Sequence, residues 1–449
     1  MTTIPSTAPG AGATGSRDER LRARLAAELA EARSRTLELV APLSDDDLHR
    51  QHDPLMSPVL WDLGHIAAFE DLWLTRNLSG HVEFSEMPGL YNPFEHPRRV
   101  RGTLALPGLS EARETMDEIR VRALVRLDSA DFRAGPQLLR DGYVYRMVLQ
   151  HEYQHDETIL QTLQLKLGAP YRPAKRRPLP AGTDLGRPGD MVLFPGGAVE
   201  LGTDDRSAAY DNERPGHVVD LAPFWIDVTP VTNGQYLEFV EAGGYRRRQL
   251  WTDEGWRWLE GSAASAPKYW ANGPDGWTTR TMDLARPLDP VRPVCHVCYH
   301  EADAYARFVG KRLPTEPEWE AAASWDPTTA AKRIYPWGDQ PWTPELANLD
   351  QLAFDTAPVG AYPHNISPIG CYGMMGEVWE WTASDFQGYP GFEAFPYQEY
   401  SEAFFGSEYK VLRGGSWATR PGAVRATFRN WDYPIRRQIF SGFRCARDA

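Results

Sequence analysis

The chain has 449 residues, of which 42% are hydrophobic and 24% are charged, and its formal net charge is −13. Its length predicts more than one domain, and its acidic balance argues against non-specific binding of a polyanion such as nucleic acid. It contains no apolar run of about 18 residues, so the sequence predicts no membrane span. Four cysteines are too few for a disulfide framework, so we expect a reduced, cytoplasmic protein.

Residues 1–15 lack the basic and apolar segments of a secretory signal, and we expect them to form a disordered tail. Ser16 and the glutamate three residues later form a capping box that predicts the start of a first helix. Ser57, as N-cap before a proline, predicts the start of a second helix, and a third helix is expected to follow Ser110. On the second helix, His65 falls on the apolar face and is expected to point inward.

The fourth expected helix runs from Tyr143 to Leu167 without a glycine or a proline. It carries His151 and His155 four residues apart, so both imidazoles lie on one face, which is also the apolar face. Two histidines at this spacing can offer two nitrogens to one divalent metal, while two buried, hydrogen-bonded histidines are the simpler alternative. The acidic and amide neighbours of the pair favour the metal. We therefore expect residues 16–169 to form a four-helix bundle with a metal in its core.

The composition changes after this helix. Residues 170–190 contain five prolines, a basic run and several glycines, and we interpret them as a linker. In residues 191–449, short β-like runs alternate with glycine, proline, asparagine and tryptophan, and only residues 232–242 and 300–309 look helical. This pattern indicates an α+β domain with much irregular structure, in which long loops are expected to carry site residues.

Several segments of the second half match a known family. They are DNERPGHVV, PVTNGQYLEFV, KRLPTEPEWEAAA, YPWGD, GMMGEVWEWTAS, VLRGGSW and GFRCAR. Through them the second half resembles the formylglycine-generating enzymes (sulfatase-modifying factors), which have a C-type-lectin-like fold. These enzymes work through a cysteine pair near the C-terminus, whereas here the cysteine that precedes Cys445 is the distant Cys371. Thiol-based oxidation by this domain is therefore not expected.

The first half, through SPVLWDLGHIA and HEYQHDE, resembles the DinB-like four-helix bundle. The two halves in this order, together with the run FRNWDYPIRRQIFSGFR, are similar to the sulfoxide synthases of ergothioneine biosynthesis. These are non-haem iron enzymes that join a cysteine thiol to the imidazole of hercynine. The resemblance implies the α+β class, with a DinB-like four-helix bundle followed by a C-type-lectin-like, formylglycine-generating-enzyme-like domain. It also implies hercynine, γ-glutamylcysteine and dioxygen as small-molecule substrates, and a monomer is compatible with the sequence.

The resemblance assigns Fe(2+) as the cofactor, held by His65, His151 and His155. Three neutral imidazoles on one face of an octahedral metal leave positions for substrates and dioxygen. Tyr397 matches the family's active-site tyrosine, which would donate a proton or a hydrogen atom during the oxygen reaction. A phenol suits this task because its ordinary pKa of about 10 keeps it protonated. Tyr400 is the neighbour with which Tyr397 could be confused.

Charged residues match the family's anchors for the thiol substrate. They are Arg98, Arg101, Asp432 and Arg436. Arginine suits bidentate binding of a carboxylate and aspartate suits an ammonium, so the set favours γ-glutamylcysteine over free cysteine as sulfur donor. The residues expected at the hercynine site are Gln154, Asn430 and Trp431. Amide and aromatic groups suit a carboxylate and a quaternary ammonium, although solvated arginines and a core tryptophan are the structural alternatives at these positions.

Three other functions stay open. HEYQH matches the H-E-x-x-H zinc-peptidase motif with Glu152 as base, but after Glu157 the next glutamate and histidine are Glu200 and His217, beyond the linker. A DinB-type metal-dependent thiol transferase would need only the bundle. A non-catalytic ligand-binding protein would need neither a metal nor turnover. The resemblance favours an Fe(II)- and dioxygen-dependent oxidoreductase that forms a carbon–sulfur bond and oxygenates the sulfur.

Overall fold

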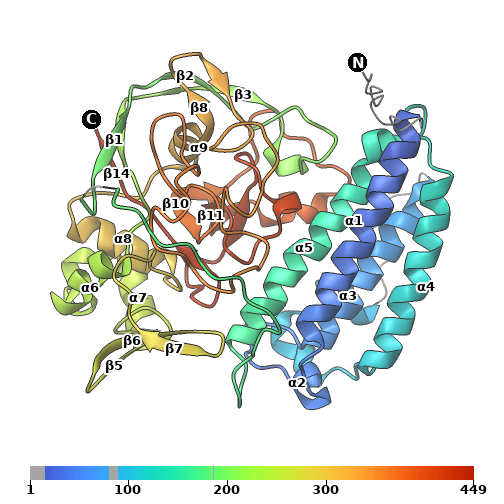
Figure 1. Cartoon of the computed structure of the whole chain (residues 1–449), viewed down its shortest axis with the longest axis horizontal. Helices are drawn as coiled ribbons and strands as arrows, with labels where there is room; N and C mark the ends of the chain where they lie inside the picture. Colours follow the sequence, from blue (N-terminus) through green and yellow to red (C-terminus); the bar gives the residue numbers. More distant parts are fainter. Residues whose placement is uncertain (1–15, 80–88, 186) are drawn as a thin grey trace, which may run out of the picture.

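The computed structural model describes residues 16–79, 89–185 and 187–449, so the tail expected at residues 1–15 lies outside the described residues. A group of long helices lies beside a second part that is built from short strands and helices (Figure 1). This confirms the expected α+β class, with the helical bundle first and the lectin-like part second. In the described part of the chain, no helix is both long and apolar enough to cross a membrane.

The bundle is built around one fully buried helix. Its helices are α1 (Arg17–Val40), α2 (Asp45–His49), α3 (Val59–Asp71), α4 (Leu109–Asp128) and α5 (Tyr143–Gln164). The chain between α3 and α4 adds the π-helical turn η1 (Leu72–Arg76) and the 3-10 turns η4 (Gly89–Tyr91) and η5 (Arg98–Thr103). α3 packs against α4 and α5, and α5 packs against α1. Every residue of α3 is buried, which explains why its apolar residues are not confined to one stripe.

The helix ends agree only in part with the sequence. Ser16 caps α1 in a capping box, as predicted. Ser57 does not cap α3, because Pro58 takes the N-cap position and the Ser57 hydroxyl accepts a hydrogen bond from Arg101 instead. α4 begins at Leu109, before the predicted start, and α5 ends before the predicted end. Helix termini are the least certain feature of a sequence pattern, since capping depends on distant partners.

The second part contains two main sheets. One has the strand order β12-β11-β10-β13 and the other has the order β1-β4-β14. The strands of these two sheets are β1 (Met191–Phe194), β4 (Phe224–Asp227), β10 (Trp379–Phe386), β11 (Gly406–Arg413), β12 (Asn430–Asp432), β13 (Ser441–Gly442) and β14 (Ala446–Asp448). The smaller sheets use β2 (Gly197–Leu201), β3 (His217–Leu221), β5 (Trp270–Gly273), β6 (Gly276–Thr281), β7 (Leu284–Pro287), β8 (Trp325–Asp326) and β9 (Ala331–Lys332). β12 lies at an edge and pairs with β11, with Trp431 opposite Val411.

The expectation that only two stretches of this part are helical is wrong. α6 (Asn233–Glu241) and α8 (Tyr299–Phe308) lie where helices were expected, whereas α7 (Asp253–Ser262) and α9 (Glu316–Ser324) were missed. Both missed helices carry a start signal in the sequence. Thr252 caps α7, and Thr315 caps α9 in a capping box. With 10 and 9 residues, they are too short to show a clear helical period.

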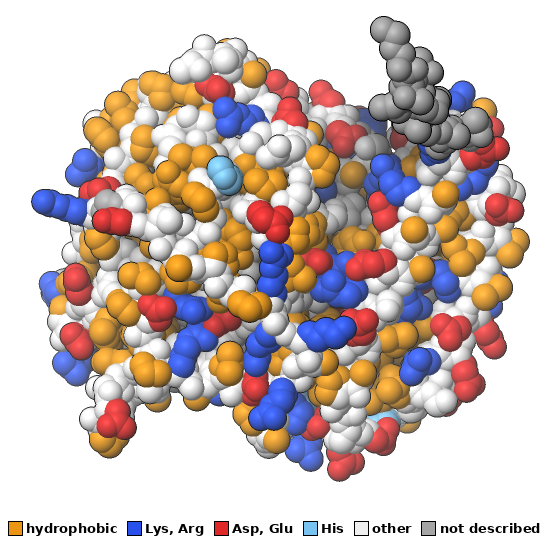
Figure 2. All heavy atoms as spheres, viewed as in Figure 1, with side chains coloured by type: hydrophobic (Ala, Val, Ile, Leu, Met, Phe, Trp, Pro, Cys, Tyr) orange, Lys and Arg blue, Asp and Glu red, His pale blue; other side chains and the backbone are white. Residues whose placement is uncertain are grey.

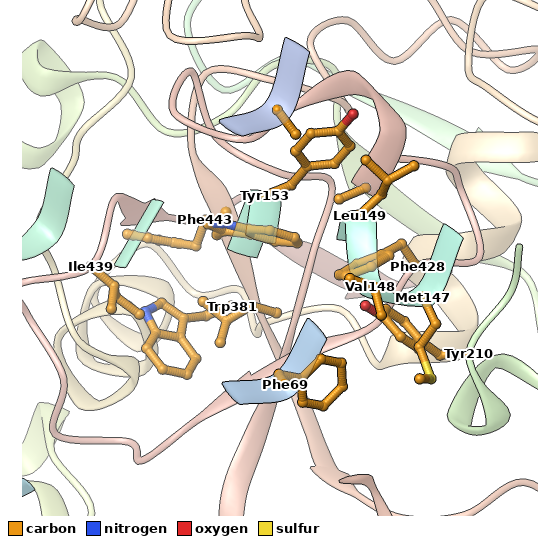
Figure 3. Close-up of a cluster of buried hydrophobic side chains, with 14 of the residues drawn as sticks. Phe69, Met147, Val148, Leu149, Tyr153, Tyr210, Trp381, Phe428, Ile439 and Phe443 are labelled. Atoms are coloured by element: carbon orange, nitrogen blue, oxygen red, sulfur yellow. The ribbon is translucent and has the colours of Figure 1, made fainter. Parts of the chain in front are cut away.

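The bundle and the second part share a hydrophobic core. Phe69 of α3 and Met147 and Val148 of α5 belong to the same buried cluster as Trp381 of β10 and Phe428 (Figure 3). Burial of apolar surface between the two parts stabilises their contact, because each buried side chain of this size contributes about 1.5–3 kcal/mol. The division at residues 170–190 stays a prediction.

A buried carboxylate also joins the two parts. Glu157 of α5 accepts hydrogen bonds from Trp379 Nε1 at 2.7 Å, Ser416 Oγ at 2.8 Å and Thr419 Oγ1 at 2.6 Å. All three donors belong to the second part. α5 is thereby fixed against β10 and the loop that follows β11, which places its histidines at the boundary between the two parts.

The surface fits the acidic composition. On the face shown in Figure 2, acidic and basic side chains are interspersed over both parts, and basic side chains do not merge into one continuous patch. A polyanion needs a continuous basic surface for non-specific binding. This face therefore gives no support to nucleic-acid binding.

Candidate metal centre

Three histidines meet where α3 and α5 pack together. His65 of α3 and His151 and His155 of α5 each offer a ring nitrogen, and these nitrogens all lie within 4.8 Å of one another. The ring centroids are 5.1 Å apart for His65 and His151, 4.9 Å for His65 and His155, and 4.6 Å for the α5 pair. The structure thus brings together the three residues that the sequence singled out, from two separate helices.

Each imidazole is held by a neighbour. His65 Nδ1 donates a hydrogen bond to the backbone oxygen of Tyr91 at 2.8 Å, which leaves its Nε2 free to bind a metal. His155 Nδ1 lies 3.2 Å from a carboxylate oxygen of Asp62. His151 stacks on Phe69, with centroids 3.7 Å apart and planes 8° apart. Metal-binding histidines usually have such supports, because they fix the tautomer and the ring direction.

The electrostatics keep His65 and His151 neutral. Burial and the neighbouring His155 place the pKa of His65 and the pKa of His151 well below the ordinary 6.5. Neutral imidazole is the form that binds metals. The residues present therefore fit a divalent transition metal, for which imidazole is a preferred ligand. Among the described residues, no carboxylate joins the three nitrogens in this group.

Glu152, the glutamate of the H-E-x-x-H motif, forms ion pairs with two buried arginines. It is fully buried and forms ion pairs with Arg33 Nε at 2.9 Å and Arg120 Nη2 at 3.3 Å. Burial raises the pKa of Glu152, but the two arginines outweigh burial and lower it below its ordinary value. A carboxylate held by two buried arginines cannot serve as the base of a peptidase. The geometry therefore argues against the zinc-peptidase alternative.

Tyr397 lies at the end of an aromatic row that starts at the histidines. Its ring stacks on Trp73 at 5.0 Å, Trp73 is 6.2 Å from Phe69, and Phe69 stacks on His151. Burial raises the pKa of Tyr397 well above its ordinary value, so its phenol is protonated at neutral pH. Tyr397 is half-buried, and the rings of Phe69 and Trp73 stand between it and His151 in this row.

The structure ties a different tyrosine directly to α5. Gln154, between the two α5 histidines, donates from Nε2 to Tyr400 Oη at 3.4 Å and accepts from Tyr210 Oη at 3.3 Å. The rings of Tyr210 and Tyr400 stack at 4.4 Å. Sequence reasoning missed Tyr210, because the loop that carries it lies far from both helices in the chain. Tyr400 was noticed only as a neighbour of Tyr397.

The expected anchors of the thiol substrate also gather near one another. Arg436 Nε lies 3.2 Å from Asp432 Oδ1. Burial lowers the pKa of Arg98, and the positive charge of Arg436 lowers it further. Burial lowers the pKa of Arg101 to about 9, and its guanidinium donates to two neutral groups, the His96 backbone oxygen and the Ser57 hydroxyl. Arg98 is half-buried and Arg101 is buried, and an anion would stabilise both positive charges.

The expected hercynine residues Asn430 and Trp431 precede Asp432 on β12. Trp431 stacks on Phe386 at 4.1 Å, and its ring is perpendicular to that of Tyr400 at 6.2 Å. Asn430 Oδ1 accepts a hydrogen bond from the backbone N–H of Trp431. Trp431 therefore has the packing role that the simpler interpretation predicts, and it also borders the residues that contact Gln154.

Known proteins resemble the chain over its length. The Sulfatase-modifying factor enzyme 1-like domain matches residues 177–449, and the DinB superfamily matches residues 28–159. The chain is 47% identical over 442 residues to the hercynine oxygenase of Mycolicibacterium thermoresistibile, covering 95% of each chain. It is 45% identical over 435 residues to that of Mycobacterium tuberculosis, covering 95% of this chain and 99% of the relative. The formylglycine-generating enzyme of Streptomyces coelicolor is 33% identical over 315 residues, covering 64% of this chain and 97% of the relative. The chain belongs to the hercynine oxygenase family.

Proposed function

We propose that the protein is a cytoplasmic, Fe(II)- and dioxygen-dependent sulfoxide synthase of ergothioneine biosynthesis. It joins the sulfur of γ-glutamylcysteine to the imidazole of hercynine and oxygenates that sulfur. The observation that carries the proposal is the group of three imidazoles, whose ring nitrogens lie within 4.8 Å of one another, in a chain that is 47% identical to a hercynine oxygenase over 95% of its length.

The three histidines would bind the iron, and Tyr397 would hold and donate a proton. Iron(II) bound by His65, His151 and His155 would supply the activation of dioxygen and a meeting point for the two substrates. Tyr397, whose pKa burial raises, keeps the proton on its Oη until a strong base forms beside it. Phe69 stacks on His151, and Phe69 and its neighbour Trp73 are both buried, so water has little access to that face of His151.

The buried arginines support γ-glutamylcysteine as the sulfur donor. Arg98 and Arg101 would bind a carboxylate of the glutamyl group, since each is a partly or fully buried cation. Asp432, paired with Arg436, would bind the ammonium of the same group. γ-Glutamylcysteine carries a carboxylate and an ammonium on its glutamyl group, farther from the sulfur than the carboxylate and ammonium of free cysteine, and this spacing favours it as the donor.

The groups around Gln154 would receive hercynine. Gln154 lies between the two ligands of α5, and its hydrogen bonds to Tyr210 and Tyr400 fix its amide. Asn430 and Trp431 on β12 would face the carboxylate and the trimethylammonium, because an aromatic face attracts a quaternary cation.

The decisive experiment loads the metal-free protein with Fe(II) without air. Hercynine is added with either γ-glutamylcysteine or free cysteine, air is admitted, and the products are identified by mass. We expect a sulfoxide conjugate that contains both substrates, formed faster with γ-glutamylcysteine. Absence of the conjugate with either thiol, although Fe(II) and dioxygen are present, would contradict the proposal, because replacing an imidazole C–H and a thiol S–H by a C–S bond removes two hydrogens and requires this oxidant.

A further inference from the structure

Arg101, Trp61 and His65 form one stacked group. The Cζ of Arg101 lies 3.4 Å from the centroid of the Trp61 ring. The same ring stacks on His65, with centroids 4.8 Å apart and planes 12° apart. A single indole therefore contacts both an expected anchor of the thiol substrate and an expected metal ligand.

One segment of chain ties this group together. Trp61 Nε1 donates to the backbone oxygen of Leu90 at 3.0 Å, and His65 Nδ1 donates to the next backbone oxygen, that of Tyr91, at 2.8 Å. The turn that offers these two oxygens is η4, and η5 carries Arg101. Trp61 and His65, one helical turn apart on α3, are thus oriented by consecutive peptide groups. Losing the indole would loosen the peptide that holds the imidazole.

The positive charge of Arg101 lies one indole ring away from His65. Arg101 is only 5% exposed, and its hydrogen bonds go to neutral oxygens. A metal cation bound to His65 would be repelled by this charge, because both lie in a buried region of low dielectric. The buried indole, 1% exposed, keeps water from screening the two charges.

We propose that Trp61 is a positioning residue that couples anion binding at Arg101 to metal binding at His65. A carboxylate-bearing ligand at Arg101 cancels the repulsion and tightens the metal, and the metal tightens the ligand by the same factor. This inference rests on the proposed function, which supplies both the carboxylate and the metal. During catalysis, binding of the glutamyl group of the thiol donor at Arg101 would therefore increase the affinity of the histidines for the metal at which the sulfur reacts.

The test measures metal affinity rather than turnover. Co²⁺, whose absorption spectrum reports imidazole ligands, is titrated into metal-free full-length protein with and without saturating γ-glutamylalanine. This peptide carries the carboxylates and the ammonium of γ-glutamylcysteine but no sulfur, so it cannot bind the metal through a thiolate. We expect the wild-type protein to bind Co²⁺ about tenfold more tightly in its presence, within the usual range of coupling between sites.

Variants separate positioning from general stability. Trp61→Phe keeps an aromatic ring between the two charges and should retain the coupling, whereas Trp61→Leu should reduce it to less than about twofold. Arg101→Gln removes the repulsion, so it should bind Co²⁺ more tightly than wild type without the peptide and show no coupling. This second variant keeps the proposal testable even where Trp61→Leu does not fold.

A matched control comes from the second part. Trp319 is also buried, also has an arginine over its ring (Arg413 Cζ, 5.5 Å) and also donates from Nε1, to Glu380 at 2.7 Å. Trp319→Leu should destabilise the fold but leave the coupling factor unchanged.

Coupling that is absent from the wild type, or that persists in Trp61→Leu, would overturn the inference without contradicting the proposed metal centre. A wild-type protein that does not bind Co²⁺ through its histidines would overturn the proposed function itself.

Discussion

The ring of Tyr91 lies directly against the backbone of Gly64. A Cβ on Gly64 would come within 2.1 Å of two ring atoms of Tyr91, whose backbone oxygen orients His65. Glycine at this position therefore lets η4 approach α3 closely enough to hold a metal ligand. The sequence alone offers no sign of this, since glycine inside a helix is normally a weakness.

Gly64→Ala should push Tyr91 away from α3 and release His65. We expect metal affinity to fall by about 10- to 100-fold, the range seen when a group that orients a ligand is lost. Gly261→Ala on α7 is the control, because a Cβ there has open space around it. Metal titration of both variants checks the prediction, and unchanged affinity in Gly64→Ala would mean that Tyr91 does not position the ligand.

Tyr397→Phe should change the product rather than stop oxygen use. Without the phenol proton, we expect the sulfur of the donor to be oxidised to a sulfinic acid while less sulfoxide conjugate forms. Mass analysis of products together with oxygen consumption measures the ratio. Tyr335→Phe, a tyrosine that stacks on Trp337, is the control and should leave the ratio unchanged. A normal rate of conjugate formation in Tyr397→Phe would remove the phenol from the mechanism.

Glu152→Gln should weaken folding without selectively removing the chemistry. The substitution removes one of the two buried carboxylates, Glu70 and Glu152, that pair with buried Arg33 and Arg120, and breaking a buried ion pair typically costs about 3–5 kcal/mol. We expect a lower Tm and normal product formation per metal-bound molecule at low temperature. If activity disappears while Tm and metal content stay at wild-type values, Glu152 has a direct role in the reaction, as a peptidase-like mechanism would require.

His296→Asn should make stability less dependent on pH. Burial lowers the pKa of His296 from 6.5 to about 3. Between pH 6.5 and about pH 3 this histidine is therefore protonated in the unfolded chain and neutral in the folded protein. Stability contributed by this group is full above pH 6.5 and is lost as the pH falls, by about 1.4 kcal/mol per unit. Asparagine suits the positive φ of 66° at this position and does not titrate.

Denaturant unfolding of both proteins between pH 6.5 and pH 4.5 measures the difference. Wild type should lose more stability than His296→Asn over this interval, and the two should converge in slope above pH 7. Parallel curves throughout would show that His296 takes up a proton in the folded state.

The local patterns of this chain predict its architecture better than its contacts. Helical spacing places His151 and His155 on one face, and the β-like runs correspond to strands of the second part. The supports of the site could not be foreseen. Asp62, Tyr91 and Tyr210 come from different segments, and their role depends on how those segments pack rather than on any spacing in the sequence.

The hydrogen bonds of Glu157 have a consequence for the history and engineering of such fusions. The same two turns of α5 that present the imidazoles are anchored by Trp379, Ser416 and Thr419 of the other half. Either half produced alone would expose to water Glu157 or its three partners, together with the apolar side chains that pack across the boundary. A hybrid enzyme made by exchanging one half with that of a relative must therefore keep Glu157 and its three hydrogen-bond donors together. New substrate preferences are more readily reached by substitutions at the boundary between the two halves than by exchanging a whole half.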